Sequence, residues 1–303
     1  AYKRFENFGK ITATYSFQYN HRKEYDIRRT EQLSKKPALD LELITNDLNV
    51  NHLIERGKWN LETGINAGYQ NNYSNTQTEA RRLVPNYDRY YAGIYSVLKY
   101  KITPQLDFEL GGRYDYDHYD VTKWYDLSDW NKQYAADYSD FVVRINQNRI
   151  LTKPSLSYNN ISVNGGIVYH PSEYFDLKFN YARVSRSPNI AELFADGLHH
   201  SAAIIERGDM RMKSETGHQF NLVADVKANV LKGLNISVNP YFFYTQNFIN
   251  QIPTGYQNTQ WGGAFVVYNY QQINARMYGL DIDAQLKITD NLTYKGSGSY
   301  VYG

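Results

Sequence analysis

The sequence predicts an all-β protein, an antiparallel transmembrane β-barrel. Three observations support this prediction. Apolar and polar residues alternate along most of the chain, and the segments with this pattern are joined by connections that are long and short in turn. In addition, 30 of the 303 residues are tyrosine. A barrel strand points alternate side chains toward lipid and toward the lumen, and aromatic residues gather at its ends. No apolar run is longer than five residues, so a transmembrane helix is excluded.

The composition excludes several other classes. The chain has no cysteine, which rules out a disulfide scaffold, thiolate metal sites and cysteine nucleophiles. Its 33 basic and 31 acidic residues give a net charge of only +2, too small for the broad attraction on which nucleic-acid binding relies. The mean hydropathy of −0.63 is that of a soluble protein. The mean hydropathy does not detect barrel strands, because their apolar residues alternate with polar ones.

The alternation is clearest in the segment 9–25, where odd positions are apolar or aromatic and even positions are polar. Runs of about ten to fifteen residues match tilted strands that cross a bilayer better than the shorter strands of a soluble β-sandwich. We predict eleven strands, in chain order at 9–25, 39–54, 59–70, 89–100, 105–118, 160–170, 174–186, 217–230, 234–247, 264–288 and 292–303.

The connections between these strands alternate in length. Short turns are predicted at 55–58, 101–104, 171–173, 231–233 and 289–291. Long loops are predicted at about 26–38, 71–88, 119–159, 187–216 and 248–263. All long loops then lie at one end of the sheet, as in an outer-membrane barrel with tight periplasmic turns and extended extracellular loops. A sandwich has no reason to segregate its loops in this way.

The strand count predicts an internal piece of a larger barrel. The first strand leaves the short-turn side and the eleventh ends on the long-loop side, whereas a closed bacterial barrel has an even number of strands. No signal peptide precedes Ala1, and the chain stops at Gly303 inside a predicted strand. We therefore expect residues 1–303 to be part of a single barrel domain.

A series of motif residues follows the strand pair at 160–186. The first strand contains Gly166 and Tyr169, and the second reads Asn180-Tyr181-Ala182-Arg183. The motif then continues through Arg186, Pro188, Asn189, Glu192, Leu193, Gly197, Gly208 and Glu215. In order and spacing these residues resemble the TonB-dependent outer-membrane receptors. Two further stretches, 112–115 and 278–281, resemble strands of the same family, and together the matches spread over most of 90–303.

The resemblance implies a 22-stranded barrel, of which this chain would form about half, with the plug domain, the TonB box and the C-terminal strands absent from it. It also implies the outer membrane of a Gram-negative bacterium, with membrane lipid, lipopolysaccharide and the TonB energy-coupling complex as partners. Ligand would be captured by the outer loops. Where haem receptors of the family tend to read "FRAP" and "NPNL", this chain has Ser187 before Pro188 and Met210 after Asp209, which weakens a haem assignment.

The loop 187–216 is the most informative segment outside the strands. Ser187 suits an N-cap, Pro188 the first helical position and Gly197 the position just after the helix, which predicts a two-turn extracellular helix. His199 and His200 follow it, and Glu206 and Asp209 are near in sequence. Imidazoles and carboxylates bind metal ions, so His199 and His200 are candidate metal ligands. The alternative is that both are ordinary loop histidines in hydrogen bonds.

The loop 119–159 is rich in aromatic residues, including Trp124, Trp130 and Tyr134. They are candidate ligand contacts that cover a flat, apolar molecule. The alternative is that they pack the loop on itself or lie at the lipopolysaccharide boundary. Charged residues at alternate positions of the strand 105–118 predict a hydrogen-bonded lattice in the lumen. Tyrosines near strand ends predict an interfacial girdle, at Tyr15, Tyr19, Tyr69, Tyr100, Tyr114, Tyr116, Tyr169, Tyr181 and Tyr244.

Signatures of catalysis are missing from the sequence. Gly296-Ser297-Gly298 lies in a predicted strand and not in the strand–turn–helix context of a nucleophile elbow. We therefore predict a transporter and no enzyme, with no tightly bound cofactor beyond a possible metal or metal chelate. The leading hypothesis is a TonB-dependent importer of a siderophore, haem or metal ion. The alternatives are a passive porin-like channel and an importer of a non-metal ligand such as an oligosaccharide or cobalamin.

Overall fold

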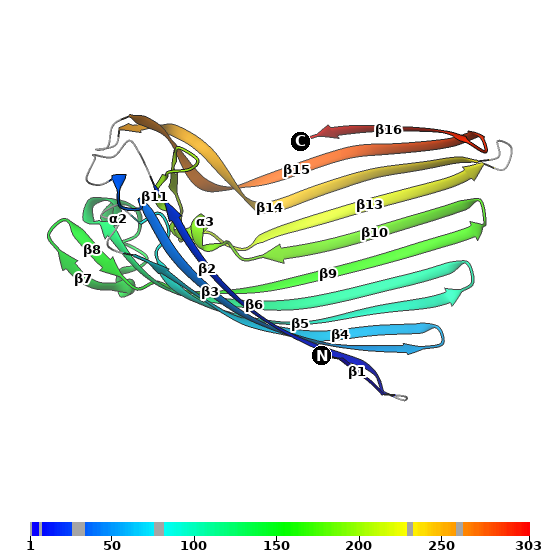
Figure 1. Ribbon diagram of the computed structural model, residues 1–303, viewed down its shortest axis with the longest axis horizontal. Helices are drawn as coiled ribbons and strands as arrows, with labels where there is room; N and C mark the ends of the chain where they lie inside the picture. The colour runs from blue at the N-terminus through cyan, green and yellow to red at the C-terminus, as the bar shows by residue number, and fades with distance from the viewer. Residues whose placement is uncertain (1, 6–7, 26–33, 76–81, 229–232, 259–262) are drawn as a thin grey trace.

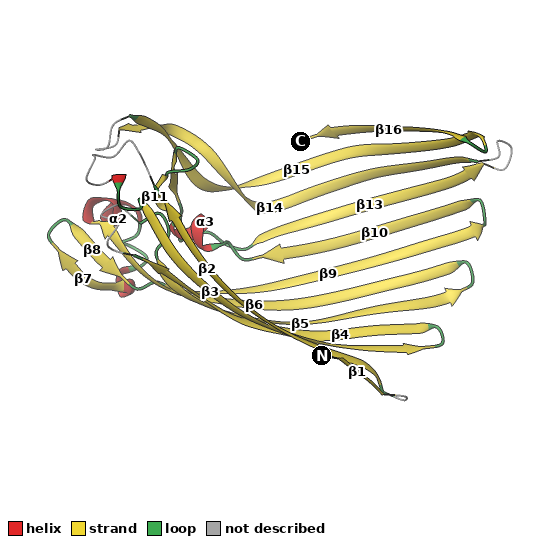
Figure 2. Cartoon of the chain, viewed as in Figure 1, coloured by secondary structure: helices red, strands yellow, loops and turns green. Residues whose placement is uncertain are grey.

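The computed structural model describes residues 2–5, 8–25, 34–75, 82–228, 233–258 and 263–303. These residues form sixteen strands, nearly all of them in one long, curved and open sheet (Figure 1). Helix is confined to short segments at one end of the sheet (Figure 2). Neighbouring strands run antiparallel, except that β12 and β15 run parallel. The predicted all-β antiparallel fold is confirmed. In the described part of the chain, no helix has the length and apolarity needed to cross a membrane.

All eleven predicted strands are present, and most are longer than predicted. They are β2 (Gly9–Glu24), β3 (Leu39–Arg56), β4 (Trp59–Ser74), β5 (Asn86–Thr103), β6 (Leu106–Asp126), β9 (Ser155–Ser172), β10 (Phe175–Arg186), β13 (Glu215–Ala228), β14 (Leu234–Asn258), β15 (Ala264–Thr289) and β16 (Leu292–Tyr302). A short strand that the sequence did not predict, β1 (Tyr2–Phe5), pairs with the start of β2.

The connections segregate to the two ends of the sheet as predicted. Tight turns join β3 to β4, β5 to β6, β9 to β10 and β15 to β16 at the right-hand end of Figure 1. The predicted turn 231–233 lies largely outside the described residues, as do parts of the predicted loops 26–38 and 71–88. The remaining loops gather at the opposite end, called here the long-loop end.

The loops at this end contain secondary structure of their own. The segment 119–159 holds α2 (Leu127–Gln133), the 3₁₀ turn η2 (Ser139–Phe141), β7 (Val142–Asn146) and β8 (Arg149–Thr152). The segment 187–216 holds α3 (Ile190–Phe194), β11 (Asp196–His199) and β12 (Ile204–Arg207).

The predicted loop 248–263 is wrong over most of its length, because β14 continues to Asn258 and stays paired with β15. Two irregularities in this pairing, at Thr245/Phe248 and Pro253/Gly255, shift the register and bend the ribbon. Each shift interrupts the strict alternation of apolar and polar residues that identifies a strand in the sequence.

One face of the sheet is apolar and exposed. A row of cross-strand partners runs over it through Val50, Ile65, Ile94, Tyr114 and Ile161. Ile65, Ile94 and Ile161 are each more than half exposed. Because these side chains stay exposed among the residues that the structure describes, the band matches the lipid face of a barrel.

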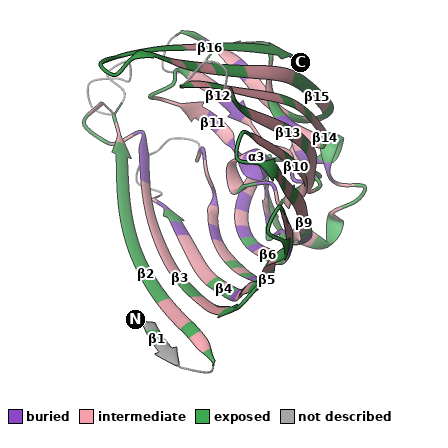
Figure 3. Cartoon of the chain, turned by 90° about the vertical axis from the view of Figure 1, so that its right-hand side faces the viewer, coloured by how far each residue is buried: buried purple, intermediate pink, exposed green. Residues whose placement is uncertain are grey.

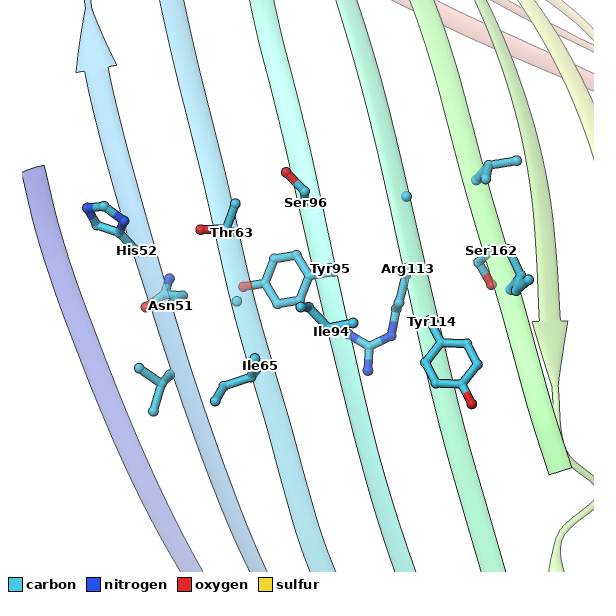
Figure 4. Close-up of a pocket in the computed structure, with 15 residues that line it drawn as sticks. Asn51, His52, Thr63, Ile65, Ile94, Tyr95, Ser96, Arg113, Tyr114 and Ser162 are labelled. Atoms are coloured by element: carbon cyan, nitrogen blue, oxygen red, sulfur yellow. The ribbon is translucent and has the colours of Figure 1, made fainter. Parts of the chain in front are cut away.

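A shallow depression crosses the same outer face (Figure 4). It follows the adjacent row of cross-strand partners, in which Thr63, Ser96 and Gly112 have short side chains or none. The bulky row of Ile65, Ile94 and Tyr114 forms one of its sides. The depression is therefore the place where the side chains of the outer face are short.

The opposite, inner face of the sheet is polar. Tyrosine residues also lie on this face, in addition to those predicted at the strand ends. The ring of Tyr91 lies over Gly68, its cross-strand partner, and the ring of Tyr95 lies over Gly64 in the same way. A methyl group on Gly68 would be 2.2 Å from the Tyr91 ring, so only glycine leaves room for it. Tyr91 and Tyr95 donate hydrogen bonds to Asp47 and Glu62 on that face. The tyrosine excess thus has a luminal part that the interfacial girdle does not explain.

The main hydrophobic core lies at the long-loop end and not in the wall. Its largest fully buried side chains are Trp130, Phe194, Leu193 and Met210. Figure 3 shows buried residues concentrated where α3 and the neighbouring loops fill the inside of the curve, while most of the wall is exposed or intermediate. The loops therefore form a small packed unit inside the mouth of the sheet.

Candidate functional site

A cluster of charged residues joins the loop 187–216 to the wall. Arg186, at the end of β10, makes two hydrogen bonds to the Glu192 carboxylate, of 2.9 and 3.1 Å. Its Nη2 also donates to Glu215 Oε2 at 2.7 Å, at the start of β13. Glu192 is nearly buried, so it depends on this paired, charge-assisted geometry. Three of the motif residues thus form one junction between two wall strands and the helix.

The helix in this loop begins later and is shorter than predicted. Its N-cap is Asn189, whose Oδ1 accepts from the backbone N–H groups of Ala191 and Glu192 at 2.9 and 3.0 Å. Glu192 closes a capping box by accepting from the Asn189 backbone N–H at 2.7 Å. Ser187 is therefore not the N-cap. Gly197 is not the residue that ends the helix, because the C-cap is Ala195 and Gly197 lies in β11.

Ser187 instead ties the loop to the inner face of the wall. Its hydroxyl donates to Asp117 Oδ2 at 2.7 Å and accepts from Asn160 Nδ2 at 2.8 Å. Arg89 donates to the other oxygen of the same Asp117 carboxylate, at 2.9 Å from Nε. The preference for Asn189 as the cap follows, because the Ser187 hydroxyl is already engaged away from the helix.

A polar pocket lies on the inner face directly beneath this junction. Its charged lining comes from Arg89, Arg113, Asp115, Asp117 and Arg186. Arg113 donates to Asp115 at 2.7 Å and to the Asn66 amide oxygen at 2.7 Å. Of the inward-facing charges of the strand 105–118, Arg113 and Asp115 thus pair with each other, and Asp117 and Glu109 pair with Arg89 and Lys99 of β5, as the predicted lattice requires.

The remaining motif residues pack the loop against itself. Gly208 lies against the backbone of α3, and a methyl group there would be 2.5 Å from the Phe194 nitrogen. Its N–H donates to Ala195 O at 2.7 Å. Lys123 of β6 donates to Phe194 O at 2.7 Å, a contact that no pattern in the sequence indicates. Leu193 and Pro188 are buried in the same contact region.

Trp130 and Tyr134 lie in the core at the long-loop end, 1% and 4% exposed. With Tyr125 they form a cluster of three rings whose centroids are 5.3 to 5.5 Å apart. Their contacts are those of the alternative in which the loop packs on itself. Burial, reinforced by the Asp209 carboxylate, raises the pKa of Tyr134 far above its ordinary value. Trp124 is different, because it is half-buried and lies outside this core.

His199 lies in β11, where its Nδ1 is 2.9 Å from Glu206 Oε1 on the paired strand β12. Its Nε2 is 3.4 Å from Arg22 Nη2 at the end of β2. Tyr270 of β15 donates to the other oxygen of Glu206 at 3.4 Å. The structure thus brings His199 and Glu206 together and adds Arg22 and Tyr270, which the sequence analysis missed because they are 177 and 64 positions away from their partners.

The other two candidate ligands lie elsewhere. His200 follows β11 in a turn, and Asp209 binds Arg211 through two oxygens, at 2.6 and 2.9 Å. In the described ranges, no three histidine, cysteine, aspartate or glutamate residues are grouped closely enough to hold a metal ion. His199 and Glu206 therefore form a polar pair at the long-loop end of the sheet.

Comparison with known families decides what kind of protein carries this arrangement. The sequence matches the family described as "TonB dependent receptor-like, beta-barrel" over residues 1–303. The chain belongs to the TonB-dependent receptor β-barrel family. This family consists of transporters and receptors of the Gram-negative outer membrane. The resemblance of the motif residues to this family is confirmed. No curated protein sequence matches the chain.

Solved structures of TonB-dependent receptors share the fold. The copper transporter OprC superimposes with a TM-score of 0.70 and 13% identity, covering 98% of this chain and 44% of that one. The Serratia marcescens hemophore receptor HasR, in complex with its hemophore HasA and heme, superimposes with a TM-score of 0.61 and 14% identity, covering 98% of this chain and 46% of that one. The FrpB iron transporter of Neisseria meningitidis (F3-3 variant) superimposes with a TM-score of 0.58 and 16% identity, covering 97% of this chain and 40% of that one. This TonB-dependent receptor chain thus spans less than half the length of these relatives, and at such identities the likeness is one of fold.

Proposed function

We propose that this chain forms part of the barrel wall and ligand-capturing loops of an active importer in the outer membrane, energised by the TonB complex. The proposed cargo is a metal chelate, such as a ferric siderophore, haem or another metal complex. The family membership supports active import, and the names of the structural relatives refer to copper, iron and heme. The observation that carries the proposal is the folded loop 187–216, which is anchored inside the mouth where an entering ligand would meet it.

We assign the first contact with ligand to His199 and Glu206. Both ring nitrogens of His199 already face polar partners, Glu206 and Arg22. A bare metal ion would have to displace one of these groups, whereas the oxygen atoms of a chelate accept hydrogen bonds from the Arg22 N–H groups that His199 does not use. Metal-chelating ligands carry such oxygens in abundance. His200 and Asp209 remain candidate contacts at the edge of this site.

The test is a binding screen on the full-length receptor. Haem, representative ferric siderophores, Cu²⁺ and Zn²⁺ are titrated against the wild type and against the His199→Ala/His200→Ala double variant. We expect at least one metal ligand to bind the wild type, and roughly a tenfold loss of affinity in the variant, about one lost charge-assisted hydrogen bond. His118→Ala is the matched control, because His118 lies on the outer face of β6, bonded to Ser157.

Three results would contradict the proposal at different levels. Equal affinities of the wild type and the double variant for every metal ligand would remove His199 and His200 from the site. Binding of an oligosaccharide or cobalamin, with no metal ligand other than cobalamin bound, would replace the cargo while keeping active import. Uptake that persists in cells without TonB would favour the passive porin-like channel instead.

A further inference from the structure

A serine, a histidine and an aspartate meet where the neighbouring wall strands β6 and β9 pair (Figure 1). His118 and Ser157 are cross-strand partners, and His118 Nδ1 lies 2.9 Å from Ser157 Oγ. The other ring nitrogen, Nε2, lies 3.3 Å from Oδ1 of Asp120 on the same strand as His118. Ser157 is 39 positions from His118 in the sequence, so no local motif marks the group. We call Ser157, His118 and Asp120 the outer triad.

The outer triad lies on the same face of the wall as the apolar band. On β6, Tyr114 and Tyr116 are exposed on the outer face. His118 and Asp120 follow them at the next two alternate positions. Side chains alternate along a strand, so the residues in between face the lumen, as Asp117 does through its contact with the loop 187–216. The group therefore faces the membrane and not the mouth of the sheet.

The surroundings of His118 determine which ring nitrogen acts as a base. A carboxylate accepts hydrogen bonds and donates none, so we assign the imidazole proton to Nε2, which faces Asp120. Nδ1 is then unprotonated and accepts the hydrogen bond of the Ser157 hydroxyl. The rings of Tyr90 and Tyr116 lie 6.3 and 6.4 Å from the imidazole and limit its rotation. A hydroxyl that donates to a neutral, oriented imidazole is a serine nucleophile with its general base.

A hydrogen-bond donor lies beside this nucleophile. The Tyr116 hydroxyl is 3.2 Å from Ser157 Oγ. When Ser157 attacks a carbonyl group, the oxyanion that forms is bonded to the same carbon as Oγ. The Tyr116 hydroxyl is therefore placed to donate a hydrogen bond to the oxyanion, a role that tyrosine side chains fill in acyl-transfer sites.

The height of the outer triad in the membrane indicates its substrate. His118 follows the exposed Tyr116 by two positions (118 − 116), toward the long-loop end. At roughly 3.3 Å per residue and a tilt of roughly 40°, it lies roughly 5 Å beyond Tyr116 along the bilayer normal. Long loops of outer-membrane barrels are extracellular, so this level is the boundary between hydrocarbon and headgroups in the outer leaflet. Lipids carry the ester bonds of their acyl chains there, and the exposed Ser157 is open to them.

We propose that the outer triad hydrolyses a carboxylic ester of a membrane lipid. Ser157 Oγ attacks the ester carbonyl carbon and its proton moves to His118 Nδ1, while Tyr116 donates a hydrogen bond to the oxyanion. The bond between the carbonyl carbon and the lipid alcohol oxygen then breaks, and that oxygen takes the proton from His118. A water molecule attacks the acyl-serine by the same steps, which releases the fatty acid and restores Ser157. Asp120 is a positioning residue that orients His118.

The test uses the full-length receptor, purified in detergent and mixed with phosphatidylethanolamine vesicles or, separately, with lipopolysaccharide. Release of fatty acid is measured for the wild type, Ser157→Ala and His118→Ala. We expect the wild type to release fatty acid from at least one of the two, which identifies the lipid. Each variant is expected to be at least about a hundredfold slower. A fluorophosphonate probe is expected to label the wild type and to leave Ser157→Ala unlabelled.

Ser155→Ala is the matched control. Ser155 lies two positions from Ser157 on the same face of β9, and its hydroxyl is 3.5 Å from His118 Nε2, the nitrogen that holds the proton. The control is expected to keep both the labelling and the hydrolysis. Asp120→Asn is expected to lower kcat about tenfold with KM unchanged, because Asp120 orients the base and does not touch the lipid. Heat-modifiable migration on gels confirms that each variant is folded.

Three results would overturn the assignment of this activity to the outer triad. The first is no release of fatty acid from either lipid by the wild type. The second is equal release by the wild type and Ser157→Ala, as a contaminating lipase would give. The third is loss of labelling in Ser155→Ala with labelling retained in Ser157→Ala. The assay contains no transport ligand, so failure of the proposed importer function would not affect it, and His118→Ala is expected to lose hydrolysis while it still binds cargo.

Discussion

At the scale of single residues, Glu192 connects three different parts of the mouth. Its carboxylate accepts from the Arg186 guanidinium and from the Asn189 backbone, so one side chain links β10, the start of α3 and, through Arg186, the start of β13. The family resemblance predicted that Arg186, Asn189, Glu192 and Glu215 matter. It did not predict that they contact one another, because their partners depend on where the chain turns between positions 186 and 215.

The first prediction concerns this carboxylate. Glu192→Gln keeps the size of the side chain but removes its charge, which leaves the Arg186 guanidinium without its bidentate partner. Glu192 is nearly buried but the Arg186 side chain is 43% exposed, so breaking the pair costs about 1–3 kcal/mol. We expect the loop 187–216 to open while the wall stays folded, so limited proteolysis will cut within 187–216 before any other change. An Arg186→Gln/Glu192→Gln variant that restores protection would support pairing as the cause; cleavage equal to that of the wild type in Glu192→Gln would contradict it.

The second prediction concerns Tyr125, whose hydroxyl is buried and has no hydrogen-bond partner in the described protein. An unpaired buried hydroxyl costs about 1 kcal/mol or more. Tyr125→Phe removes the hydroxyl and keeps the ring in contact with Trp130 and Tyr134. We expect the thermal midpoint of the full-length receptor to stay the same or rise. Tyr158→Phe is the contrasting change, because its hydroxyl donates to Met212 O, and it should lower the midpoint.

At the scale of elements, the strands were predictable and the loop structure was not. The eleven wall strands follow from alternation, since lipid on one side and water on the other impose it. The structure of 119–159 and 187–216 does not follow from alternation, because residues distant in the sequence pack against both sides of these segments. The helix in 187–216 shows the difference: Ser187 has the character of an N-cap, but Asp117 on β6 engages its hydroxyl, and Asn189 takes the role.

The third prediction concerns the glycine and tyrosine pairs on the inner face. Gly68→Ala places a methyl group within 2.2 Å of the Tyr91 ring, so the ring has to leave its position and its hydrogen bond to Asp47. Overpacking of this kind costs about 1–3 kcal/mol. Gly112→Ala is the matched control, because its methyl group would meet no atom within 4 Å. We expect a lower unfolding temperature for Gly68→Ala alone; equal losses in both variants would show a general intolerance of side chains.

The fourth prediction concerns the response of the loop core to alkali. Burial raises the pKa of Tyr134, and of Tyr138 beside it, above the ordinary value of 10.0. The folded loop thus holds these phenol protons more tightly than the unfolded chain does. Its stability is fully present below pH 10 and declines as the pH rises above that value. We expect tyrosinate absorbance and protease cleavage within 119–159 to increase together above pH 10. A Tyr134→Phe variant with unchanged alkaline sensitivity would contradict this cause.

At the scale of the whole molecule, two kinds of stabilisation are separated in space. The wall has an exposed apolar face and a hydrogen-bonded polar face, so lipid must cover the first. The long-loop end has a protein core of its own, built around Trp130 and Phe194. Alternation and loop lengths predict the first of these regions from sequence. The second could only be guessed from the aromatic content of 119–159, with no indication that α3 supplies the other half of its core.

The fifth prediction tests the assignment of the two faces. Ile94→Arg puts a charge on the outer face of β5, where burial in lipid costs about 2–4 kcal/mol at the middle of the bilayer. Val97→Arg adds the same side chain to the same strand, three positions on and on the inner face. We expect the yield of folded receptor in outer membranes to fall for Ile94→Arg and to be nearly normal for Val97→Arg. The reverse order would mean that the faces are assigned the wrong way round.

The parallel pairing of β12 with β15 has a consequence for how the molecule assembles. Ile204 pairs with Val266, 62 positions later (266 − 204). The strands β13 and β14 lie between these two residues in the sequence. Closing such a long chain segment has an entropic cost that is recovered only after the intervening hairpins exist. The segment 187–216 is therefore translated before β15 but docks after it. The mouth closes as a late step in folding, on a wall that is already in place.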